Sequence, residues 1–315
     1  YINMLFRTYT HGKVTVRGAN WLFFIVIAAQ IIVGVAAVLF TEILGREASV
    51  NYLLASTQIF AVFIPCFIYL IVKGVHIKET LRFKPIRLQY VFLSLLLGIS
   101  SQYIAQMLNL PVLLLLSLLG ELPPSPIEIP TDVPGMLITL GIVSILPAVF
   151  EEIMVRGIIM RAYEIRGTKT GIIISAIFFG LLHMDIKNLV GPIVFGIIFS
   201  YLVVHTGSIY AGMLAHFANN AFAVIIGYLQ ETHAEKFNFI NTYAFVLIAF
   251  FISVVIFRFC IRYLQGHTET EIKPPISDGK SDFKAAFVNV PVILNLIIYV
   301  ILLFSEIAAI VNGTA

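Results

Sequence analysis

The chain has 315 residues, of which 59% are hydrophobic and only 12% are charged, with a formal net charge of +3. A soluble domain carries about 25% charged and 45–50% apolar residues. The composition therefore excludes a soluble enzyme, a disordered chain and a collagen-like fibre, because the surplus apolar surface has to face lipid. At about 20 apolar residues per span, a chain of this length holds eight or nine transmembrane helices.

Nine apolar runs are predicted to be membrane spans. In chain order they are Trp21–Phe40, Tyr52–Val72, Tyr90–Leu110, Met136–Tyr163, Gly171–His183, Leu189–Val204, Ser208–Tyr228, Thr242–Leu264 and Val290–Val311. The apolar piece Pro111–Gly120 is short, which favours a re-entrant or interfacial segment, and the proline-rich stretch Glu121–Gly135 is predicted to be a loop. No internal repeat is visible, so residues 1–315 are predicted to form a single all-α polytopic membrane domain.

The basic residues are distributed unevenly between the two sides of these spans. Sixteen of the 20 Lys and Arg residues fall on the side of the N-terminus, three (Arg46, Lys187 and Lys236) fall on the other side, and Arg156 lies within the fourth run. Cytoplasmic loops carry the excess of Lys and Arg. The count therefore predicts a cytoplasmic N-terminus and nine spans; if one run does not cross, the number is eight and the C-terminus changes side.

The fourth run contains three charges that an apolar helix should not contain. Each ionised group near the bilayer centre costs about 2.5–3.5 kcal/mol, so such groups are paired and usually mark function. Glu152 and Arg156 are four residues apart and share a helix face, where they can pair. Glu151 is turned by about 100° and lacks that partner. The alternative is a helix-packing ion pair plus a glutamate that reaches the interface.

Two further polar groups lie in later runs: Phe179 with His183 in the fifth, and His216 with Asn220 in the seventh. A single histidine in a membrane helix is more often a packing residue, but two on separate helices beside an unpaired glutamate favour a shared site. At a rise of about 1.5 Å per residue the groups lie at similar depths. We expect Glu151, His183, His216 and Asn220 to face one polar cavity in the cytoplasmic half of the membrane.

A carboxylate, two imidazoles and an amide are suited to hydrolysis by direct water attack. Glu151 would take a proton from a water held by His183, and His216 and Asn220 would donate hydrogen bonds to the oxyanion. The same side chains can also be read as a zinc site formed by Glu151, His183 and His216. The sequence contains no HExxH, GxSxG or nucleotide-binding motif, which disfavours those enzyme classes.

The three motifs resemble those of the CPBP intramembrane endopeptidases, which include CAAX prenyl protease 2 and the bacterial Abi and bacteriocin-processing or immunity proteins. The family signature EExxxR, FxxxH and HxxxN or HxxxD occurs here, in order and on separate spans. The resemblance covers about a quarter of the chain, Pro147–Ala223, within a catalytic core of about residues 136–228.

The resemblance implies an intramembrane endopeptidase in which Glu151 and His183 activate water and His216 and Asn220 stabilise the oxyanion. Supporting roles fall to Glu152, Arg156 and Phe179. Family members have been described both as metalloproteases and as metal-free glutamate-type proteases. We therefore expect no required cofactor as the first choice and keep zinc open.

The expected partners are membrane lipid and a peptide or membrane-protein substrate, of which a prenylated CAAX-like protein is one; no nucleic acid is expected. Two other functions remain open. A catalytically silent peptide-binding or immunity protein is disfavoured because all four candidate residues are intact. A proton-coupled transporter is disfavoured because such proteins are built from related halves and no repeat is visible.

Overall fold

The computed structural model describes residues 12–44, 50–123 and 128–313. Within these ranges the secondary structure is helical, apart from one isolated bridge between Gly12 and Val75. Arg7 and Arg46, which entered the prediction of orientation, lie outside the described residues. The all-α fold predicted from the composition is therefore confirmed for the part of the chain that can be described.

Seven helical segments are long and apolar enough to cross a membrane. They are Val16–Ile43, Val50–Lys73, Leu88–Ser117, Val133–Arg166, Ile209–Thr232, Tyr243–Gly266 and Val290–Asn312. The fifth and sixth predicted spans form two shorter apolar helices, α9 (Thr168–Leu182) and α10 (Val190–Thr206). At about 1.5 Å per residue these two helices reach about 22–26 Å, less than the ~30 Å hydrocarbon core. Seven long apolar helices are those of a multi-pass integral membrane protein.

The long helices are α1 (Val16–Leu44), α5 (Leu88–Ser117), α11 (Ile209–Thr232), α13 (Tyr243–Gly266) and α15 (Val290–Asn312). The second span is divided into α2 (Val50–Ser56), η2 (Thr57–Phe63) and α3 (Ile64–Lys73), and the fourth into α6 (Val133–Thr139), η3 (Leu140–Ile145), α7 (Leu146–Glu152), η4 (Ile153–Ile159) and α8 (Met160–Tyr163). The short connecting elements are α4 (Ile77–Thr80), η5 (Glu164–Arg166), α12 (Ala234–Phe237), η6 (Asn238–Asn241) and α14 (Gly279–Phe287).

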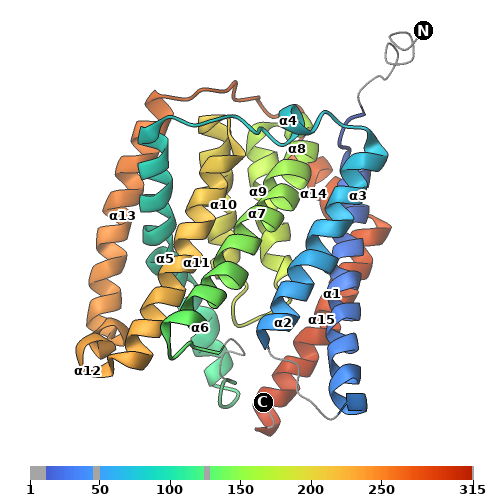
Figure 1. The fold of residues 1–315 in the computed structure, drawn as a ribbon. Helices are drawn as coiled ribbons and strands as arrows, with labels where there is room; N and C mark the ends of the chain where they lie inside the picture. The colour runs from blue at the N-terminus through green and yellow to red at the C-terminus, as the bar shows by residue number, and fades with distance from the viewer. Residues whose placement is uncertain (1–11, 45–49, 124–127, 314–315) are drawn as a thin grey trace.

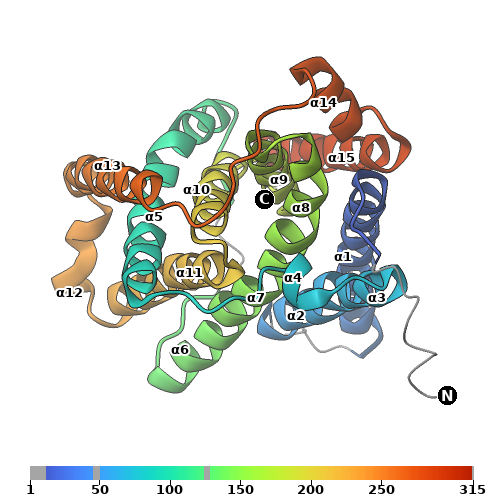
Figure 2. The ribbon, with the colours of Figure 1, turned by 90° about the horizontal axis from the view of Figure 1, so that it is seen from above.

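The helices α7, α9, α10 and α11 occupy the middle of the bundle (Figure 2). On one side α5 and α13 pack against them, and on the other side α1, α3 and α15 do so. Two apolar clusters follow this division, one around Phe23 and Phe178 and the other around Phe199 and Leu202. Many large apolar side chains of α1, α13 and α15 stay exposed, which is the expected surface toward lipid.

The second and fourth spans are interrupted by wide turns of π-helix. After η2, η3 and η4 the next N–H bonds the carbonyl five residues back, from Ile64 to Ile59, from Leu146 to Gly141 and from Met160 to Val155. Pro65 and Pro147 follow two of these segments. A proline has no N–H and its ring clashes with the carbonyl four residues earlier, so a regular α-helix is disfavoured there. Such π segments occur often at functional sites.

The prediction of a separate re-entrant piece at Pro111–Gly120 is wrong. Helix α5 continues through Pro111 to Ser117. Proline is tolerated inside a membrane helix where neighbouring groups satisfy the freed backbone. Just before this proline, Asn109 connects α5 to the start of α10 and the loop that precedes it. Its Nδ2 donates to Lys187 O at 2.6 Å, and its Oδ1 accepts from Val190 N at 3.3 Å.

The connection from α3 to α5, the turn η5 and the connection from α13 to α14 all lie at one end of the bundle (Figure 1). These segments carry Lys78, Arg82, Arg166 and Lys273. The helix α12, with Lys236, lies at the opposite end. The fold thus gathers at one end the connections in which most of the basic residues of the sequence occur.

Candidate active site

The two adjacent carboxylates lie at the C-terminal end of α7, between the π segments η3 and η4. Glu151 is 7% exposed and Glu152 is fully buried. Helix α7 packs against η2 on one side, where Phe150 stacks on Phe63 with ring centroids 4.6 Å apart, and against α11 on another. The carboxylates therefore point into contacts between helices rather than toward lipid.

Glu152 forms a buried ion pair with Arg156, with 2.5 Å between Oε1 and Nη1. The guanidinium also donates to Gly196 O at 3.2 Å and to Ser200 Oγ at 3.3 Å, both on α10. Its carbon lies 4.7 Å from the centroid of Phe179, within the range of a cation–π contact. The predicted pairing of Glu152 with Arg156 is confirmed, and the pair joins α7 and η4 to α9 and α10.

His216 lies on α11 between the rings of Phe179 and Phe199 and is 3% exposed. Its Nδ1 is 3.0 Å from Glu152 Oε1. Because an ionised carboxylate only accepts, the hydrogen of this contact is carried by Nδ1. Nε2 lies 3.9 Å from Glu151 Oε2. The structure thus brings together Glu151 and His216 from two different spans.

The two oxygens of Glu151 have different surroundings. Oε1 accepts a hydrogen bond from Gln58 Nε2 at 2.7 Å. Oε2 is buried, faces His216 and has no hydrogen-bond partner among the described residues. The sequence analysis did not single out Gln58, although it is the only amide side chain in the run Tyr52–Val72. A lone amide in an apolar span is a signal that could have found it.

Asn220 lies one helical turn after His216 and bonds the backbone of the fourth span. Its Nδ2 donates to Val143 O at 2.8 Å, and its Oδ1 accepts from Asn219 Nδ2 at 3.0 Å. Val143 O lies four residues before Pro147, which has no N–H to offer it. An amide nitrogen has two hydrogens, so Asn220 keeps one for a further acceptor.

His183 caps the C-terminus of α9, and its side chain is exposed. Its Nδ1 lies 2.9 Å from Phe179 O. The contacts of the described residues include no hydrogen bond or ion pair from His183 to Glu151 or His216. The ring of Phe179 contacts both imidazoles, with centroids 5.1 Å from His183 and 5.6 Å from His216.

Gly212 is a further residue that the sequence analysis did not single out. It lies one turn before His216 on α11, and a Cβ at this position would be 2.7 Å from Glu152 Oε2. Glycine therefore lets α11 approach the ion pair closely enough for His216 to reach Glu152. The sequence gives no sign that a glycine is needed here, because Glu152, the residue that a side chain would meet, lies about 60 residues earlier in the chain.

The zinc alternative requires Glu151, His183 and His216 to converge. Among the described residues no group of three or more His, Cys, Asp and Glu side chains is placed to hold a metal ion. As placed, these three residues therefore do not fit a three-ligand zinc site.

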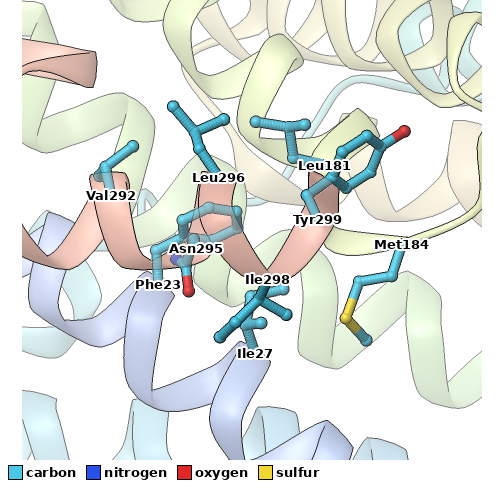
Figure 3. Close-up of a pocket in the computed structure, with 9 residues that line it drawn as sticks. All are labelled: Phe23, Ile27, Leu181, Met184, Val292, Asn295, Leu296, Ile298 and Tyr299. Atoms are coloured by element: carbon cyan, nitrogen blue, oxygen red, sulfur yellow. The ribbon is translucent and has the colours of Figure 1, made fainter. Parts of the chain in front are cut away.

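Two hollows of the molecule are formed by other residues. One lies between α1, the end of α9 and α15 (Figure 3), and is lined by Phe23, Ile27, Leu181, Met184, Val292, Asn295, Leu296, Ile298 and Tyr299. The other is an apolar groove between α5 and α13. Neither is lined by Glu151, His183, His216 or Asn220.

Part of the chain is similar to known proteins. Residues 133–222 match the family model described as type II CAAX prenyl endopeptidase Rce1-like. The chain is 36% identical over 95 residues to the "Putative membrane peptidase YdiL" of Bacillus subtilis (strain 168), and this alignment covers 30% of the chain and 38% of that protein. No solved structure matches. The resemblance predicted from the three motifs is confirmed for this segment, since residues 133–222, which contain all three motifs, match the Rce1-like type II CAAX prenyl endopeptidase model.

Proposed function

We propose that this protein is an intramembrane endopeptidase that hydrolyses a peptide bond of a membrane-associated substrate, a prenylated CAAX-like protein being one candidate. The observation that carries the proposal is the free, buried oxygen of Glu151 facing Nε2 of His216, inside the segment that matches the peptidase family. A buried carboxylate oxygen without a donor is suited to accept a proton from water.

In the proposed reaction Glu151 takes a proton from water, and the water oxygen attacks the carbonyl carbon of the substrate. The oxyanion that forms accepts hydrogen bonds from His216, in its protonated form, and from the remaining N–H of Asn220. The C–N bond then breaks, and Glu151 returns the proton to the leaving amine. The role of His183 in holding the water is supported by the family resemblance alone, since no described contact joins it to Glu151.

The test compares peptide termini in membranes of cells that make the wild-type protein, the Glu151→Gln variant or Glu235→Gln at equal levels. Glu235 is an exposed residue of α12, so its variant is a matched carboxylate-to-amide control. We expect termini that are present with wild type and Glu235→Gln and reduced about 10²- to 10⁴-fold with Glu151→Gln, because a general base is lost.

Equal termini from all three proteins would overturn the proposal and favour a catalytically silent binding protein. If the termini depend on Glu151, the cleavage rate of the purified wild-type protein is then measured with and without a chelator, which tests whether the reaction needs a metal. A rate that is unchanged by the chelator supports the glutamate-type reaction, and a rate that is lost and restored by zinc supports a metalloprotease.

A further inference from the structure

One polar side chain of the second span contacts Glu151. This span lies outside the segment that matches the peptidase family. Gln58 is half-buried on η2, and its Nε2 donates to Glu151 Oε1 at 2.7 Å. We infer that Gln58 is a positioning residue that holds the carboxylate of Glu151 for proton transfer. This inference rests on the proposed function, because it assigns Gln58 a role in the same reaction.

The Glu151 carboxylate is asymmetric, because only one of its two oxygens accepts a hydrogen bond from the described residues. The terminal torsion of a glutamate is broad and roughly two-fold, so an unheld carboxylate samples many orientations. A donor on Oε1 fixes the plane of the group and leaves Oε2 directed at His216. Oε2, which accepts no hydrogen bond from the described residues, is then the oxygen that faces His216.

The amide of Gln58 is oriented with its nitrogen toward Glu151. Both oxygens of an ionised carboxylate accept, so the nitrogen of the amide has to face Glu151. The Oε1 atom of Gln58 itself is buried without a partner among the described residues. A buried, unpartnered acceptor is destabilising, and an apolar side chain would serve packing alone better. The hydrogen bond that Gln58 donates is therefore a better explanation for a glutamine at this position than the volume of its side chain.

The segment η2, which bears Gln58, packs against α7. The stacked rings of Phe63 and Phe150 hold η2 against α7, which carries Glu151. The wide turn of η2 is closed by the bond from Ile64 N–H to Ile59 O, in the segment that also bears Gln58. The N-terminal spans thus contribute to a site whose recognised motifs all lie later in the chain.

The test measures kinetics of the full-length protein in proteoliposomes, with a peptide that spans the cleavage site identified from the membrane termini. Gln58→Met keeps the volume and removes the donor, whereas Gln58→Asn keeps a donor on a shorter side chain. We expect kcat to fall about 10- to 100-fold in Gln58→Met with KM unchanged, and to fall less in Gln58→Asn. A role in packing alone predicts the reverse order, because Asn leaves the larger gap.

A double-variant cycle separates positioning from a general loss of structure. If Gln58 acts through Glu151, adding Gln58→Met to Glu151→Gln causes no further loss of the residual rate. Gln30→Met is the matched control, since Gln30 is a half-buried amide of the apolar helix α1 with no described bond to Glu151. Wild-type kcat in Gln58→Met, or additive losses in the cycle, would overturn the inference.

The outcomes distinguish this inference from the proposed function. If the wild-type protein and Glu151→Gln give the same termini, the proposed function fails and the role of Gln58 fails with it. If Glu151→Gln abolishes cleavage and Gln58→Met leaves it intact, the peptidase stands and only the positioning role is wrong.

Discussion

The charge of Arg156 lies in the middle of the bundle, where the residue is only 1% exposed. Glu152 neutralises the charge, a serine and backbone carbonyls of α10 take the other N–H groups, and Phe179 covers the guanidinium face. The spacing of Glu152 and Arg156 predicted the pair, since residues four apart share a face. The partners on α10 could not be predicted, because they are about 40 residues away and belong to another helix.

Removing Arg156 should destabilise the protein strongly. In Arg156→Ala the buried carboxylate of Glu152 loses its counter-charge, and breaking a buried pair in this way costs about 3–5 kcal/mol. Arg87→Ala is the matched control, because its pair with Glu269 is exposed to solvent. Thermal unfolding in detergent should show a much lower unfolding temperature for Arg156→Ala and an almost unchanged one for Arg87→Ala. Equal unfolding temperatures of the two variants would contradict this account of the pair.

At the scale of the elements, the site depends on close approach between helices. Helix α10 supplies the partners of Arg156, and its Gly196 lies against α9: a Cβ there would be 2.6 Å from Ala176 Cα. Small residues at helix contacts let backbones approach closely in membranes, where van der Waals packing replaces the hydrophobic effect between helices. The sequence predicted α9 and α10 as spans, but the glycine contact that joins them depends on their packing.

Gly196→Ala should separate α9 from α10 and weaken both the fold and the site. A methyl group that meets backbone has to displace a helix, and such overpacking costs about 1–3 kcal/mol. Gly34→Ala on α1 is the control, since a Cβ at Gly34 meets nothing within 4 Å. We expect a lower unfolding temperature for Gly196→Ala alone. The same temperature in both variants would show that α9 and α10 can adjust without loss.

At the scale of the whole molecule, the bundle has one end rich in basic connections and one end poor in them (Figure 1). The positive-inside rule relates this asymmetry to membrane orientation. We therefore propose that the end with α4 and α14 faces the cytoplasm, as the distribution of Lys and Arg predicts.

Thiol labelling of intact cells tests this orientation. Lys78→Cys on α4 and Lys236→Cys on α12 place thiols at exposed positions of opposite ends, and the native Cys66 and Cys260 are buried. A membrane-impermeant thiol reagent should label Lys236→Cys in intact cells and Lys78→Cys only after lysis. Labelling in the opposite pattern would invert the orientation, and labelling of both would show that one predicted span does not cross.

The sequence by itself determined the all-α fold class, the nine apolar runs and the residues of the three motifs. These follow from local properties: apolar runs of sufficient length, charges that lipid does not tolerate, and spacings of four residues on one helix face. Only the tertiary structure decided which of these side chains meet. It joins Glu151 to His216 and Gln58, gives Asn220 a backbone partner beside Pro147, and leaves His183 at the end of α9. The reason is that contacts between helices depend on helix rotation, on π turns and on glycine contacts, which are set by packing across the whole bundle.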